Sequence, residues 1–151
     1  MALLVIEPRQ QYDEGEWRTL LFSALWVFDA VAGADEKIDS KEETAFLETL
    51  SAFNPTPLVD KIQSDLHANI DRLKKEFEAD PRDVSKGLTE VEALLARYPN
   101  REHAAETRRA LVSLATKVAE ASGGFLGMGN KVSKAEADAI VRIRALLRLP
   151  A

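Results

Sequence analysis

The chain has 151 residues, of which 46% are hydrophobic, contains no cysteine and carries a formal net charge of −5. The absence of cysteine excludes disulfides, thiol nucleophiles and cysteine-ligated metal centres, and the acidic balance with scattered basic residues argues against nucleic-acid binding. No stretch approaches the roughly twenty apolar residues of a membrane-spanning helix, and the apolar run at residues 2–6 is too short for a signal peptide. We therefore expect a soluble, cytoplasmic protein with one hydrophobic core and no transmembrane segment.

The first predicted helix, which runs to about Gly33, is apolar on every side. Asp13 and Glu16 stand at its start with the spacing of a capping box, in which each side chain bonds the backbone N–H of the other residue. A helix that is apolar all round belongs inside a protein. We expect this helix to form the centre of the core, with Trp17 and Trp26 as anchors.

A short acidic turn at residues 34–43 separates this helix from the second one. Asp39 and Glu42 repeat the capping-box spacing at the start of the second helix, which ends at Phe53. The turn therefore places several carboxylates at the end of the most apolar segment of the chain.

Two further helices are predicted in the middle of the chain. Thr56 and Pro57 open the third helix as a cap followed by proline at the first helical position, and we expect Asp80-Pro81 to start the fourth helix in the same manner. Gly87 should weaken the fourth helix without breaking it. The third helix is predicted to be continuous because it carries an apolar stripe at steps of three and four: Leu58, Ile62, Leu66, Ile70, Leu73 and Phe77.

The fifth helix is predicted to be capped by Asn100 and to end in the glycine-rich stretch at residues 122–130. Ser133 and Glu136 form a third capping-box pair at the start of the last helix. We expect the apolar residues of the glycine-rich stretch to fold back on the core. If they were exposed, they would form a patch suited to a protein partner or a membrane surface. These residues are Phe125, Leu126 and Met128.

The first and last thirds of the chain resemble one another. Lys37-Ile38-Asp39 followed by Glu42 matches Lys131-Val132-Ser133 followed by Glu136, and each set follows an apolar helix. No segment shows the two-residue alternation of a strand. We therefore predict an all-α fold: a single domain over residues 1–151, a compact bundle of about six helices with a pseudo-twofold repeat. The repeat halves span approximately residues 16–53 and 101–149, and helices within residues 57–98 connect them.

The two turns of this repeat resemble those of the TerB-like domain of tellurite-resistance proteins. The resemblance rests on Ala34-Asp35-Glu36-Lys37-Ile38-Asp39 with Glu42, and on Ala121-Ser122-Gly123-Gly124-Phe125 leading to Glu136. It implies an all-helical fold, divalent-metal binding through the acidic turns, and a role in a bacterial stress system. Related domains accompany J-domain co-chaperones. The chain departs from the family pattern at Glu36, where glycine is usual, and at Ser122, where aspartate is usual.

The acidic turn is the candidate metal site. Asp35, Asp39 and Glu42, together with Glu43 or Glu136, could supply oxygen ligands to a hard cation such as Ca²⁺ or Mg²⁺. A cation would also offset the roughly 0.3 to 1 kcal/mol by which the end of a helix disfavours negative charge. The alternative is that Asp39 and Glu42 only cap their helix, as Ser133 and Glu136 would do in the second copy.

No catalytic constellation is recognisable. His67 and His103 are distant in sequence, and neither lies beside a nucleophile or within a Glu-x-x-His pair. We therefore expect a protein that is not an enzyme. A second hypothesis follows from the seven acidic residues against two lysines between Asp29 and Glu48: a metal-free module that binds a basic protein partner through an acidic face.

Overall fold

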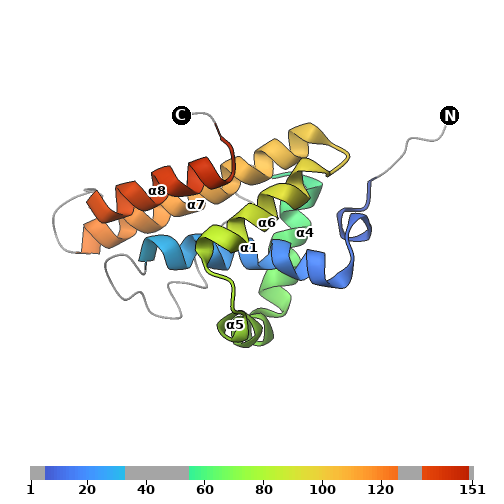
Figure 1. Cartoon of the computed structure of the whole chain (residues 1–151), viewed down its shortest axis with the longest axis horizontal. Helices are drawn as coiled ribbons and strands as arrows, with labels where there is room; N and C mark the ends of the chain where they lie inside the picture. Colours follow the sequence, from blue (N-terminus) through green and yellow to red (C-terminus); the bar gives the residue numbers. More distant parts are fainter. Residues whose placement is uncertain (1–5, 33–54, 126–133, 150–151) are drawn as a thin grey trace.

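The computed structural model describes residues 6–32, 55–125 and 134–149, except for the side chains of residues 121–125. Within these ranges the chain forms a short 3₁₀ helix and six α-helices and no strand, so the predicted all-α fold class is confirmed. The elements are η1 (Pro8–Gln11), α1 (Glu14–Ala32), α4 (Pro57–Ala68), α5 (Ile70–Ala79), α6 (Val84–Ala96), α7 (Arg101–Phe125) and α8 (Lys134–Leu146) (Figure 1).

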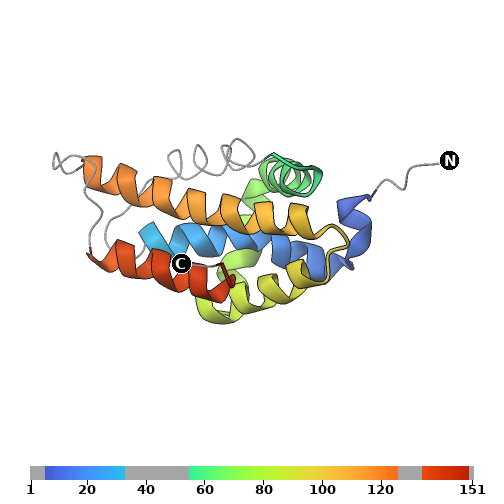
Figure 2. The ribbon, with the colours of Figure 1, turned by 90° about the horizontal axis from the view of Figure 1, so that it is seen from above.

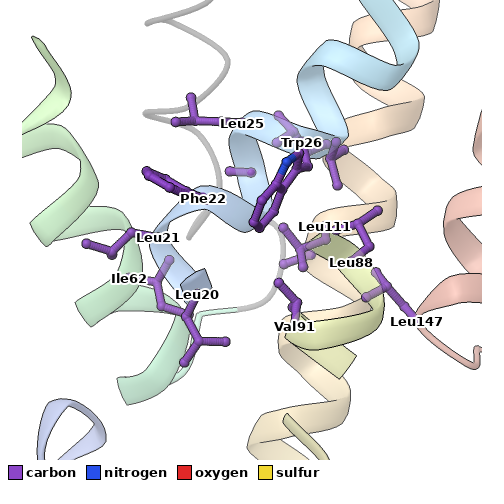
Figure 3. Packing of buried hydrophobic residues seen from close by; sticks show 14 of the residues in the cluster. Leu20, Leu21, Phe22, Leu25, Trp26, Ile62, Leu88, Val91, Leu111 and Leu147 are labelled. Carbon is purple, nitrogen blue, oxygen red and sulfur yellow. The ribbon is translucent and has the colours of Figure 1, made fainter. Parts of the chain in front are cut away.

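Helix α1 is the centre of the molecule, as its composition predicts. Thirteen of its nineteen residues are buried, and it contacts α4, α5, α6, α7 and α8. Figure 2 shows α1 between α7 on one side and α6 and α8 on the other. Side chains from all six described α-helices contribute to one hydrophobic cluster. Figure 3 shows part of it, including Leu20, Phe22 and Trp26 of α1, Ile62 of α4, Leu88 of α6 and Leu111 of α7.

The apolar stripe predicted as one continuous helix is divided between α4 and α5. The break lies at Asn69, whose side-chain amide donates to the carbonyl of Asp65 at 3.0 Å. In a continuous helix that carbonyl would accept from the backbone N–H of Asn69, which instead donates to Leu66 at 3.3 Å. Asparagine thus replaces a helical bond with one of its own. Figure 1 shows the result, because α5 is seen end-on while α4 runs across the view.

Helix α6 starts later than predicted. Its cap is Asp83, whose carboxylate accepts from the backbone N–H of Lys86 at 2.8 Å, so the prediction that Asp80-Pro81 opens the helix is wrong. The carboxylate of Asp80 is engaged by Arg82 instead. Gly87 lies within α6 without breaking it, as predicted, and a Cβ atom at this position would come within 2.3 Å of the Trp26 ring.

Three other predicted caps are present, whereas the pairs Asp39–Glu42 and Ser133–Glu136 include residues outside the described ranges and stay predictions. Asp13 and Glu16 make both bonds of the capping box, at 2.9 and 2.8 Å. Thr56 accepts from Val59 at 3.1 Å, and Asn100 accepts from the backbone N–H of His103 at 2.9 Å.

Helix α7 ends at Phe125, inside the glycine-rich stretch at residues 122–130 as predicted, after continuing through Gly123 and Gly124. A glycine weakens a helix by roughly 1 kcal/mol without stopping it, and the preceding turns of α7 pack on the core. Leu126 and Met128 lie outside the described residues, as does the side chain of Phe125, so the predicted packing of all three stays a prediction.

Helix α8 ends in a Schellman motif. The backbone N–H of Leu149 donates to Arg144 at 2.9 Å, and that of Arg148 donates to Ala145 at 3.1 Å. Such a motif requires a left-handed residue, usually glycine, just after the helix. Here that residue is Arg148, with a φ of 55°.

Candidate functional site

The two helices that precede the predicted turns, α1 and α7, end at the same end of the bundle. Figures 1 and 2 show the last turns of α1 and α7 and the first turn of α8 gathered there, and α8 contacts both other helices. Of the five predicted metal ligands, Asp35, Asp39, Glu42 and Glu43 lie outside the described residues. Glu136 is described and lies at this end of the bundle, in the first turn of α8.

Glu136 is almost completely buried, with 1% of its surface exposed. The other charged side chains of this turn differ, because Lys134 and Asp138 pair with each other at 3.2 Å in solvent. A carboxylate withdrawn from water requires hydrogen bonds or positive charge around it, and the start of a helix provides some of the latter. The sequence indicated Glu136 as a ligand or a capping partner, but gave no sign of its burial.

The end of α1 offers no basic side chain to the acidic residues that follow it. Val31 and Ala32 are buried, whereas Asp29 is exposed, and the last turn of α1 contains no lysine, arginine or histidine. The negative end of this helix dipole is therefore followed directly by the acidic segment.

Within the described ranges, no three His, Cys, Asp or Glu side chains come close enough together to hold a metal ion. This finding does not reach the four predicted ligands outside those ranges, so the metal site stays a prediction. His67 is exposed on α4, and His103 is half-buried at the start of α7.

A buried ion pair joins α6 to α7. Arg108 donates to both oxygens of Glu92, from Nε at 2.6 Å and from Nη2 at 3.1 Å, and both side chains are largely buried. One feature of the sequence could have predicted that Glu92 is buried and needs a partner. Glu92 stands four residues after Leu88 and three before Leu95, within the apolar stripe of α6.

Arg82 connects the segment before α6 to α1. Its guanidinium donates to both oxygens of Asp80 and, at 3.0 Å, to the hydroxyl of Thr19. It also lies 5.0 Å from the centre of the Trp26 ring. The hydrogen bonds from Arg82 lower the pKa of Asp80 below its ordinary value. These contacts join the segment before α6 to α1, so we assign this cluster a structural role.

An aromatic cluster fixes the chain before α1. The Tyr12 ring stacks on the rings of Trp17 and Tyr98, and its hydroxyl donates to the carbonyl of Leu94 at 2.9 Å. Arg97 lies over the Tyr12 ring. This arginine also forms a double hydrogen bond with Glu16, at 2.8 and 3.0 Å. The capping box of α1 is thereby joined to the end of α6.

The structure defines the chain as an all-helical bundle protein, and none of the helices in its described ranges combines the length and apolar character needed to cross a membrane. Comparisons with protein-family models, curated proteins and solved structures find no match. The resemblance to TerB-like domains therefore rests on the residues of the two turns alone.

Proposed function

We propose that this chain is a non-enzymatic, TerB-like cytoplasmic module that binds a divalent cation, Ca²⁺ or Mg²⁺, in a bacterial stress system. The site would lie at the end of the bundle where α1 and α7 end and α8 begins. The observation that supports it best is the burial of Glu136 at this end, beside the helix from which the acidic segment continues. Carboxylate oxygens from several segments are the ligands that these hard cations prefer.

In this proposal Asp35, Asp39 and Glu42 supply most of the ligands. Glu43 and Glu136 complete the oxygen set, and Glu136 ties the ion to α8. Binding would join the two halves of the repeat, because the acidic segment follows α1 whereas Glu136 follows α7. The ion would also neutralise the negative charge that meets the end of α1.

The test is the thermal midpoint of metal-stripped protein with and without Ca²⁺, Mg²⁺, Mn²⁺ and Zn²⁺. An ion that binds only the folded state should add about 2.7 kcal/mol of stability at a hundred times its dissociation constant. The Asp35→Asn/Asp39→Asn double variant should lose this gain, whereas Glu102→Gln, which changes an exposed carboxylate at the start of α7, should keep it. If no ion shifts the parent at millimolar concentration, the metal proposal is wrong.

The second candidate is a metal-free acidic face that docks a basic protein partner. It is favoured by the exposure of Asp29, the first of the seven acidic residues that extend to Glu48. Such docking should weaken steeply with ionic strength and should not need a divalent ion. Binding of a lysine-rich peptide in EDTA, lost at high salt and reduced in the double variant, would support this candidate over the first.

A further inference from the structure

A small cleft lies at the break between α4 and α5, away from the proposed metal site. It encloses about 190 Å³, which corresponds to about six water molecules at their volume in the liquid. Trp17 and Leu21 of α1 and Leu73 of α5 lie at its base, but all three are almost completely buried, so the exposed lining is mainly polar. Arg9, which lies over the Trp17 ring, also lines the cleft. Asn69, the residue at the break, also lines the cleft.

Several polar groups of the cleft are already fixed by one another. Asp65 accepts from the indole N–H of Trp17 at 3.0 Å and pairs with Lys61 at 3.2 Å. Arg72 pairs with Glu76 at 2.9 Å across one turn of α5. These contacts hold Trp17 in place and pair the charges of Asp65, Arg72 and Glu76.

Two opposite charges on α1 are not engaged in this way. Glu14 and Arg18 both line the cleft and are exposed, and neither makes a hydrogen bond or ion pair with any described residue. Their spacing of four residues would allow them to pair with each other. Instead, the cleft presents a carboxylate and a guanidinium that are both available to a ligand.

We propose that this cleft binds a small zwitterion of the α-amino-acid class. The guanidinium of Arg18 would bind the ligand carboxylate, and Glu14 would accept from its ammonium group. The ligand's side chain would cover only the small exposed parts of Trp17, Leu21 and Leu73. The volume of about 190 Å³ would accommodate a ligand of about the size of one amino acid, and it is below the roughly 300 Å³ at which pockets for larger ligands begin.

The experiment is an NMR titration of the full chain in EDTA, which keeps it independent of the metal proposal. L-leucine is the probe, and the indole N–H of Trp17 and the side-chain amide of Asn69 are the reporters. Both signals should shift with L-leucine. N-acetyl-L-leucine lacks the ammonium charge and L-leucinamide lacks the carboxylate, so each should bind at least tenfold more weakly.

Two variants and one control complete the test. Glu14→Gln and Arg18→Gln should each weaken L-leucine binding about tenfold or more. Lys75→Gln, which changes an exposed residue of α5 outside the cleft, should leave binding unchanged. The proposal is overturned if 10 mM L-leucine moves neither reporter, if all three compounds bind equally, or if both cleft variants bind L-leucine as the parent does.

Discussion

Gly87 shows how a single residue sets the distance between two helices. The Trp26 ring occupies the space where a side chain at position 87 would stand, so α6 packs on α1 with its backbone against the indole. Arg82 lies near the same ring. Trp26, the largest fully buried side chain of the core, therefore fits because position 87 carries no side chain.

We expect Gly87→Ala to destabilise the protein by about 2 to 3 kcal/mol, because the added methyl group overpacks the core. The matched control is Gly15→Ala in the first turn of α1, where a Cβ would meet its nearest neighbour at an ordinary 3.6 Å. That variant should gain about 0.5 kcal/mol, since alanine favours a helix over glycine. Urea unfolding measures the change in the free energy of unfolding for each variant. The packing argument would be contradicted if both changes had the same sign.

Glu16 gives the protein a defined acid sensitivity. Hydrogen bonds from Arg97 and from the backbone N–H of Asp13 lower the pKa of Glu16 from its ordinary 4.5 to about 2. A group with a lowered pKa in the folded state stabilises that state above its unfolded pKa, and this stability is lost as the pH falls through the folded pKa.

We therefore expect Glu16→Gln to have a lower thermal midpoint than the parent at neutral pH, with the difference shrinking between pH 4.5 and pH 2. Arg97→Gln should show the same pH dependence, because it removes the other half of the pair. Thermal midpoints measured across this pH range provide the test. A difference that stays constant down to pH 2 would show that the ion pair is not its source.

At the scale of the helices, several ends are determined by a side chain or a backbone motif that can be changed. Arg148 occupies the left-handed position of the Schellman motif after α8, a conformation that costs a residue other than glycine roughly 1 kcal/mol or more. Arg148→Gly should stabilise the protein by about 0.5 to 1 kcal/mol. Arg148→Ala, which removes the same side chain but keeps a Cβ, should give no such gain in chemical denaturation.

The contact between α6 and α7 depends on its buried ion pair. Glu92→Ala or Arg108→Ala should each cost about 3 kcal/mol, because each leaves the opposite charge buried without its partner. The double replacement Glu92→Leu/Arg108→Leu should recover most of that loss, since two apolar groups need no partner. Guanidinium unfolding of the parent, the two single alanine variants and the Glu92→Ala/Arg108→Ala double variant gives the coupling energy, and additive single effects would argue against a coupled pair.

Stability should be unevenly distributed over the molecule as a whole. Thirteen residues of α1 are buried, whereas in α5 only Leu73 is, among the residues the structure describes. Amide hydrogens of residues 20–28 should therefore exchange at the rate of global unfolding, and those of α5 should exchange through smaller openings. Native-state hydrogen exchange measures this directly. Equal protection of both helices would contradict a core organised around α1.

The sequence predicts the features of this fold that depend on neighbouring residues. The apolar circumference of α1 and the caps at Asp13, Thr56 and Asn100 are local patterns, and the structure confirms them. The break at Asn69 escaped prediction because a polar residue is tolerated beside an apolar stripe. Its cause is a local side-chain bond that competes with the helix and that the stripe does not reveal.

Contacts between distant residues could not be predicted. The need for glycine at position 87 comes from Trp26, sixty-one positions earlier, and the burial of Glu136 comes from its place in the bundle. For the candidate metal site, the five proposed ligands come from the sequence alone, and the structure adds the position and burial of Glu136. The predicted repeat has its two turns in ranges that the structure does not describe, so it stays a prediction.

The central position of α1 has a consequence for the synthesis of the protein. This helix is translated about a hundred residues before α8, one of the helices that cover it, which corresponds to about 5 to 20 seconds on the ribosome. Throughout that interval the part of its apolar surface that α8 covers in the folded protein remains exposed. The nascent protein should therefore bind chaperones that recognise apolar segments, and slowing translation between α1 and α8 should lower the yield of folded molecules.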